Sequence, residues 1–169
     1  MILIITGEVK CGKTTLVKQL VEKLENIKLW GFVTPSIFDK GRVVGYMAEI
    51  LPTNKSFLLV STSGEGEKVG RFILLNEGKK TLFSELERLK GDFFIFDEFG
   101  PLELRGGGLR SLFNRFLESG KSGVVVVRKR ILDVFLRDIN QPYMVFDAEK
   151  NDAINKLLEE IKKLLRGGM

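Results

Sequence analysis

Histidine is absent from this sequence of 169 residues, and cysteine occurs once. The chain therefore cannot use an imidazole as a general base or a metal ligand, and it cannot form an internal disulfide. No apolar run approaches the roughly 20 residues that a membrane-spanning helix requires. We interpret the short apolar run at residues 1–5 as a strand rather than a signal sequence. These absences predict a soluble, cytoplasmic protein that does not enter a membrane.

The sequence also lacks a block of residues with the same charge. The 27 Lys and Arg residues give a net charge of +5 over the 22 Asp and Glu residues, and the two kinds are interspersed. Such scattering is typical of a solvated surface, so nucleic-acid binding is compatible with the charge but is not indicated by it. A hydrophobic content of 44% in this length predicts one globular domain over residues 1–169, and we expect a monomer.

What the chain does contain, close to its start, is a glycine-rich loop. Residues 7–15 read GEVKCGKTT, which matches the phosphate-loop pattern GxxxxGK[ST]. The loop follows the apolar run 1–5, and Leu16, Leu20 and Leu24 then recur at helical spacing. Because strand, loop and helix are in register, we predict a nucleoside triphosphate site. The predicted nucleotide-binding residues are Gly7, Glu8, Val9, Lys10, Cys11, Gly12, Lys13, Thr14 and Thr15.

Each residue type in this loop has a chemical reason. Gly7 and Gly12 let the backbone curl so that successive N–H groups point at an anion. Lys13 brings a positive charge to the β- and γ-phosphates and is a candidate catalytic residue, while Thr14 is the usual hydroxyl ligand of Mg²⁺. Thr15 is placed near the α-phosphate. The following helix directs its N-terminal N–H groups at the same oxygens.

The single cysteine, Cys11, lies inside this loop. Lys10, Lys13 and the helix N-terminus would favour its thiolate, but it has no base partner for nucleophilic catalysis. We therefore interpret Cys11 as a spacer that contributes through its backbone.

Further along, apolar runs alternate with helical patterns, which predicts an α/β fold. We expect strands at 29–34, 93–96, 124–127 and 143–146, and helices at 77–89, 109–118, 131–139 and 153–165. Between residues 35 and 75 the pattern changes to short β-like pieces separated by turn signals, such as DKG at 39–41 and GEG at 64–66. Helices are not indicated there. We therefore expect an antiparallel β insertion at the edge of the sheet.

The predicted strand 93–96 is followed by two adjacent carboxylates, Asp97 and Glu98. An acidic residue at the carboxyl end of a buried strand can hold Mg²⁺ beside the nucleotide, so Thr14 and Asp97 form the candidate metal site. A Glu directly after it can take a proton from the water that attacks the γ-phosphate. Kinases activate a substrate hydroxyl instead, so Glu98 favours hydrolysis and is a candidate catalytic base. The alternative is an acidic pair that only ends a strand at the surface.

With these motifs the chain resembles the small P-loop nucleoside-triphosphatase family, the thermostable type with a human cancer-related member. The resemblance rests on the early phosphate loop, on the segments GFVTP (31–35), GRVVGY (41–46) and VGRF (69–72), and above all on DEFGPLEL (97–104). The last is similar to the family signature DEIGxMEL. The resemblance implies a RecA-like P-loop NTPase fold with a mostly parallel central sheet. It also implies slow, Mg²⁺-dependent hydrolysis of ATP, GTP and other triphosphates to diphosphates with little base selectivity, carried by Lys13, Thr14, Asp97 and Glu98.

Two positions depart from the family pattern. Phe38 stands where the family often has an arginine, and Arg128 stands where it has a histidine. Arg128 follows the predicted strand 124–127, so it could stabilise charge on the γ-phosphate as an arginine finger supplied in cis and is a further catalytic candidate. The alternative is a solvated basic cluster with Lys129 and Arg130.

Other assignments stay open at the level of sequence. Glu103 is either a second catalytic carboxylate or a residue that orders a loop by pairing with a nearby cation, and Trp30 is expected to be partly buried in the core. Two other functions are compatible with the motifs. One is a small-molecule kinase that holds its acceptor in the insertion, and the other is a nucleotide-switched module that binds RNA or protein.

Overall fold

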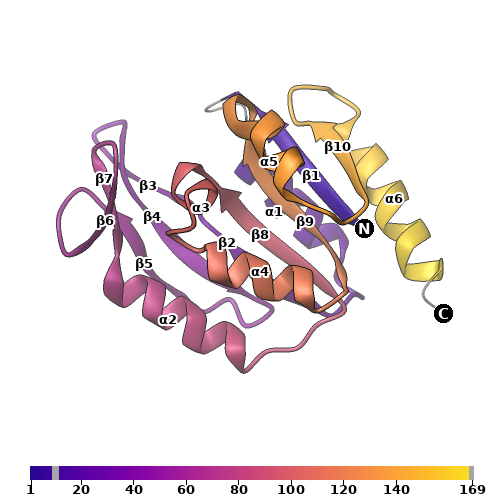
Figure 1. Ribbon diagram of the computed structural model, residues 1–169, viewed down its shortest axis with the longest axis horizontal. Helices are drawn as coiled ribbons and strands as arrows, with labels where there is room; N and C mark the ends of the chain where they lie inside the picture. The colour runs from indigo at the N-terminus through magenta and orange to yellow at the C-terminus, as the bar shows by residue number, and fades with distance from the viewer. Residues whose placement is uncertain (9–11, 168–169) are drawn as a thin grey trace.

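A ten-stranded mixed sheet forms the centre of the computed structural model, which describes residues 1–8 and 12–167 (Figure 1). The strand order is β10-β1-β9-β8-β2-β4-β5-β7-β6, and β3 pairs with β4. The strands are β1 (Ile2–Gly7), β2 (Leu29–Val33), β3 (Ser36–Asp39), β4 (Arg42–Leu51), β5 (Ser56–Ser61), β6 (Gly66–Val69), β7 (Phe72–Leu75), β8 (Phe93–Phe99), β9 (Ser122–Arg128) and β10 (Tyr143–Asp147). The predicted α/β class is confirmed.

One half of the sheet, β10-β1-β9-β8-β2, is parallel. Ile4 of β1 lies between Val125 of β9 and Val145 of β10, and Phe96 of β8 pairs with Phe32 of β2. The inner strands β1 and β9 are continuous apolar runs, as expected where helices cover both faces of a strand. Their carboxyl ends therefore meet at one edge of the sheet, where the phosphate loop leaves β1.

The other half, β4-β5-β7-β6 with β3, is the expected antiparallel insertion. It joins the parallel half where β2 pairs antiparallel with β4, with Val33 opposite Glu49. The turn between β3 and β4 uses Lys40 and Gly41, both at positive φ (51° and 76°), which suits a tight hairpin. The sequence did not predict β3 or β6, and β6 begins at Gly66, the last residue of the turn expected at 64–66. Each strand has only four residues, with apolar and polar side chains mixed, and each pairs with the next strand along the chain, β4 or β7.

The helices form a layer on each face. They are α1 (Lys13–Lys23), α2 (Asn76–Glu87), α3 (Pro101–Leu104), α4 (Arg110–Glu118), the 3₁₀ turn η1 (Lys129–Ile131), α5 (Leu132–Asp138) and α6 (Ala153–Gly167). Residues of α1 and α6 pack with one face of β1, whereas residues of α2, α4 and α5 pack in a second cluster on the opposite face. Trp30 joins the second cluster, its ring against those of Phe94 and Phe116, which agrees with the expected burial.

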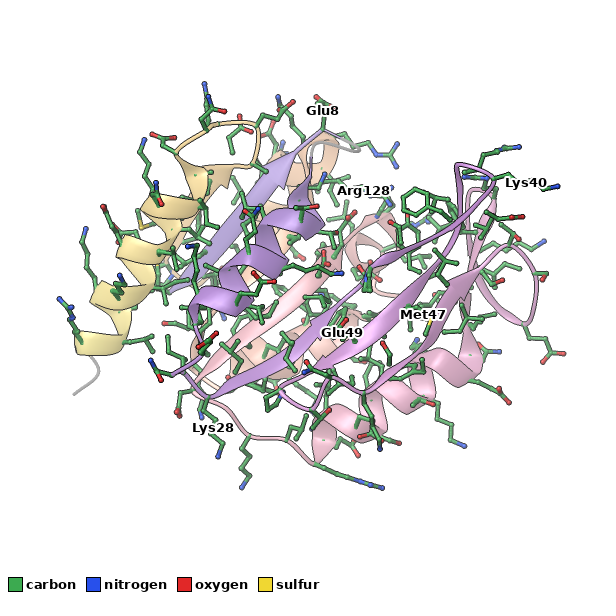
Figure 2. The ribbon with its side chains drawn as sticks, turned by 180° about the vertical axis from the view of Figure 1, so that it is seen from behind. Glu8, Lys28, Lys40, Met47, Glu49 and Arg128 are labelled. Atoms are coloured by element: carbon green, nitrogen blue, oxygen red, sulfur yellow. The ribbon has the colours of Figure 1, made fainter. Side chains whose placement is uncertain are left out.

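The helix layers do not cover the two halves equally. Seen from behind, α1 and α6 lie over the parallel strands, while the side of β4 that carries Met47 and Glu49 has none of the described helices over it (Figure 2). Leu58 of β5, paired with Met47, is 42% exposed. Among the described residues, no helix combines the length and apolarity needed to cross a membrane.

Candidate active site

The phosphate loop joins β1 to α1, as its pattern predicts. Gly12 adopts φ 89° immediately before α1 begins at Lys13, a conformation that favours glycine. Lys13 is buried, and its ammonium donates to the carbonyl oxygens of Gly7 (3.1 Å) and Glu8 (2.9 Å). Thr14 is half-buried and Thr15 is exposed. The predicted site residues Val9, Lys10 and Cys11 lie outside the described residues.

Asp97 of β8 is fully buried beside this loop. Its Oδ2 atom accepts hydrogen bonds from the backbone N–H (3.0 Å) and the hydroxyl (3.2 Å) of Thr34, which directly follows β2. The Thr14 hydroxyl lies 3.4 Å from the same oxygen. The adjacent parallel strands β2 and β8 thus bring Thr34 onto Asp97, and α1 brings Thr14. The sequence assigned no role to Thr34, although its place at the end of a buried strand was a usable signal.

The surroundings of Asp97 fit a divalent cation. Burial raises the pKa of Asp97 to about 7, and the hydrogen bonds from Thr34 only partly oppose this effect. Its second oxygen, Oδ1, is buried and has no hydrogen-bond partner among the described residues. A buried carboxylate oxygen left in this way beside a threonine hydroxyl matches the oxygen donors that Mg²⁺ prefers. Thr14 and Asp97 can therefore hold the ion.

Glu98 and Arg128 meet at the same edge of the sheet. Glu98 follows Asp97 in β8, Arg128 ends the neighbouring strand β9, and the Arg128 Nε atom donates to the Glu98 carboxylate in an ion pair. The two side chains are 27% and 34% exposed, respectively. Figure 2 shows Arg128 on the same side of the molecule as Glu8 of the phosphate loop. Lys129 and Arg130, by contrast, are exposed.

Tyr46 of β4 approaches this pair from the insertion. It is half-buried against Phe72, with the ring centroids 5.6 Å apart. Burial raises the pKa of Tyr46, and the negative charge of Glu98 raises it further. Tyr46 thus lies within electrostatic reach of Glu98. No local pattern in the sequence could identify it, because the pairing of β4 with β2 places it there. Phe38, on β3, is 66% exposed.

Glu103 orders the loop that follows β8. Its two carboxylate oxygens accept hydrogen bonds from the backbone N–H groups of Gly100 and Leu109, each at 2.9 Å. Burial raises the pKa of Glu103. Gly108 has φ 56°, and a Cβ atom there would lie 1.8 Å from a Glu103 oxygen, so only glycine fits. These contacts favour the loop-ordering alternative for Glu103, although the partners are backbone N–H groups rather than the expected cation.

A carboxylate from the insertion supports the same loop. Glu67 of β6 accepts a hydrogen bond from the Gly108 N–H (3.0 Å) and pairs with Lys79 of α2 (3.0 Å). The first backbone N–H groups before α4 therefore point at Glu67 and Glu103, as suits the positive end of a helix.

The arrangement as a whole defines a class of protein. A strand, a GKT loop and a helix lie beside a buried Asp that is followed by Glu, and β9 separates the strand of the loop from the strand of the carboxylates. This is a P-loop NTPase with the RecA-like strand arrangement.

Comparison with known proteins defines the family. A family model described as NTPase matches residues 2–162, and the chain belongs to that NTPase family. The chain is 32% identical to a protein named nucleoside-triphosphatase THEP1 from Hyperthermus butylicus, over 95% of this chain and 90% of the relative. It is 30% identical to the protein of that name from Methanocaldococcus jannaschii, over 99% of each chain. The predicted family is confirmed.

Solved structures agree with this fold. The crystal structure of THEP1 from Aquifex aeolicus superposes with a TM-score of 0.68 at 23% identity, over 97% of this chain and 99% of that one. The solution structure of a human cancer-related nucleoside triphosphatase gives a TM-score of 0.70 at 20% identity, over 99% of this chain and 98% of that one.

Proposed function

We propose that the chain hydrolyses nucleoside triphosphates to diphosphate and phosphate with Mg²⁺, and that Glu98 activates the attacking water. One observation carries the assignment of the base. Glu98 directly follows the buried Asp97 at the sheet edge where Lys13 and Thr14 begin α1. A carboxylate in this position suits a water nucleophile.

The roles of the other residues follow from their placement. Lys13 exchanges its carbonyl partners Gly7 and Glu8 for oxygens of the β- and γ-phosphates. Thr14 and Asp97 hold Mg²⁺, with Thr34 fixing the Asp97 carboxylate. When bound, Mg²⁺ supplies positive charge to the phosphate oxygens.

The bond changes balance with water as the only co-reactant. Glu98 takes one proton from water while the water oxygen forms a bond to the γ-phosphorus. The bond from that phosphorus to the bridging oxygen breaks, and the nucleoside diphosphate leaves with the bonding electron pair. Arg128 stabilises negative charge on the γ-phosphate. All these groups interact with phosphates rather than with the base, so we also propose low base selectivity. We further propose that the protein acts as a monomer.

The test is phosphate release from ATP, GTP, CTP and UTP with Mg²⁺ and no added acceptor. We expect release from several of the four, and we expect Glu98→Gln to lower the rate by about two orders of magnitude through loss of the general base. The matched control is Glu118→Gln, which removes the same charge from an exposed residue at the end of α4. Lys13→Ala should cripple triphosphate binding or turnover.

Two results would contradict the proposal. Hydrolysis by Glu98→Gln at the parent rate would remove Glu98 as the base. Loss of ATP only in the presence of an acceptor, with a phosphorylated product in equal amount, would establish a kinase instead.

A further inference from the structure

We infer that Arg128 changes partner from the Glu98 carboxylate to the γ-phosphate when a triphosphate binds, and that this exchange lets the site distinguish a triphosphate from its diphosphate product. The inference rests on the proposed function and adds to it a specificity-determining role for Arg128.

The placement of Arg128 makes both partners accessible. Strand β9 lies between β1 and β8, and Arg128 pairs in register with Gly7, where the phosphate loop begins. On its other side β9 borders β8, and the guanidinium of Arg128 contacts the Glu98 carboxylate there. A single side chain is thus placed between the phosphate loop and the candidate base.

The ion pair between Arg128 and Glu98 is weak enough for Arg128 to exchange Glu98 for another anionic partner. Both side chains keep about a third of their surface in solvent, and ion pairs at that exposure are weak. A γ-phosphate offers more negative charge and several acceptor oxygens, to which arginine binds strongly. A diphosphate lacks the γ-phosphate and offers Arg128 no competing acceptor, so Arg128 stays paired with Glu98.

The exchange also frees the base. While Arg128 donates to Glu98, it occupies a carboxylate oxygen that is then not open to the attacking water. Moving the guanidinium to the phosphate releases Glu98 for water only when a hydrolysable group is present. The neighbouring Lys129 is placed differently, within 3.8 Å of Glu8 and 3.6 Å of Glu149.

The experiment is a double-mutant cycle measured by binding, not turnover. Affinities for the β,γ-methylene analogue of ATP and for ADP are measured by calorimetry at constant Mg²⁺, for the parent, Glu98→Gln, Arg128→Gln and the double variant. Arg130→Gln is the matched control, since it removes the same charge from an exposed position two residues along the chain.

The exchange predicts three results. Arg128→Gln weakens analogue binding by about tenfold or more, as for loss of a charge-assisted hydrogen bond, and leaves ADP binding unchanged. Glu98→Gln strengthens analogue binding, because Arg128 no longer has to be released. This gain is about two- to fivefold larger with Arg128 present than in the Arg128→Gln background, the value of a partly exposed ion pair.

The comparison within the cycle separates exchange from simple repulsion between Glu98 and the phosphates. Repulsion alone gives a gain that is equal or larger in the Arg128→Gln background, and that result overturns the inference. So does equal weakening of ADP and analogue binding by Arg128→Gln. In either case, Glu98-dependent phosphate release would still stand, so failure of the inference is distinguishable from failure of the proposed function.

Discussion

The parallel and antiparallel halves of the sheet differ in burial and in what they contribute to the site. In the parallel half, runs such as Phe93–Phe96 and Val124–Val127 are fully buried because helices pack on both faces. In the insertion, β5 and β6 keep exposed residues, and α2 packs beside β4, β5 and β7. The parallel half carries the phosphate loop and Asp97-Glu98. The insertion supplies Tyr46 beside Glu98 and Glu67 at the following loop.

This contrast separates two kinds of contribution. The residues proposed to act on phosphates lie at the ends of strands that are tightly packed on both faces. The packing fixes their positions and can keep a carboxylate such as that of Asp97 away from solvent. The insertion residues lie around this site instead: Tyr46 is within electrostatic reach of Glu98, and Glu67 accepts a hydrogen bond from the loop that follows β8. Each of the following predictions compares the two halves.

The largest expected effect comes from cutting into the parallel core. The Phe96 ring is fully buried against those of Phe32, Phe113 and Phe116, with the closest centroid at 5.0 Å. Phe96→Ala should lower the free energy of unfolding by about 3–5 kcal/mol, through lost burial and a cavity. Urea denaturation followed by circular dichroism measures this change in the free energy of unfolding.

The matched change in the insertion is Leu58→Ala, on the side of the sheet that the described helices leave bare. Because Leu58 is 42% exposed, the loss should stay within about 1 kcal/mol. Equal losses for the two variants would mean that the halves do not differ in packing as described.

An intermediate effect is expected at Glu103, where the two halves meet. Glu103→Gln keeps the size of the side chain but replaces one accepting oxygen with an NH₂ group, which then faces the N–H of Gly100 or Leu109. We expect a loss of about 1–3 kcal/mol of stability, as for a buried donor left unpaired. Thermal and urea unfolding measure this loss, and Glu118→Gln, with an exposed side chain, should be neutral. A neutral Glu103→Gln would show that these hydrogen bonds do not order the loop.

The smallest effect is expected at Glu67. The Gly108 N–H, and then Lys79, lower the pKa of Glu67 from 4.5. The ionised form is therefore favoured by folding, so its contribution is present above pH 4.5 and is lost as the pH falls through the folded-state pKa. Glu67→Gln should cost about 0.5 kcal/mol at neutral pH, since the pair with Lys79 is a third exposed.

That pH dependence is the check. The difference in unfolding free energy between parent and Glu67→Gln should shrink below pH 4.5. Glu65→Gln, two residues earlier, is the matched control, since it removes the same charge from an exposed side chain. A difference that grew on acidification would have the wrong sign for a carboxylate with a lowered pKa.

The sequence predicted the parallel half well because its signals are local. A continuous apolar run such as residues 93–96 indicates a doubly covered strand whatever its neighbours are, and the ends of such strands must share an edge. The proximity of Thr14 to Asp97 could therefore be anticipated. So could the position of Arg128 near the site, although not its ion pair with Glu98.

The sequence was less informative where strands are very short or where contacts depend on the backbone and on the strand order. Residues 36–39 and 66–69 are four-residue segments with apolar and polar side chains mixed, too short for a clear alternation, and they become strands by pairing with the strands that follow them, β4 and β7. Tyr46 comes within electrostatic reach of Glu98 because β4 pairs with β2. No periodic pattern in the sequence indicates that pairing. Glu103 stayed ambiguous because its partners are backbone N–H groups, which no residue type reveals.

The strand order has a further consequence, for self-association. An unpaired apolar edge strand can form backbone hydrogen bonds with the same strand of another copy of the chain, which leads to aggregation. Strand β2, with the sequence LWGFV, would be such an edge if the parallel half stood alone, but β4 pairs with it. The last strand on this side is instead β6, which has four residues and includes Glu67 and Lys68. The insertion thus replaces an aggregation-prone border with a short, charged one.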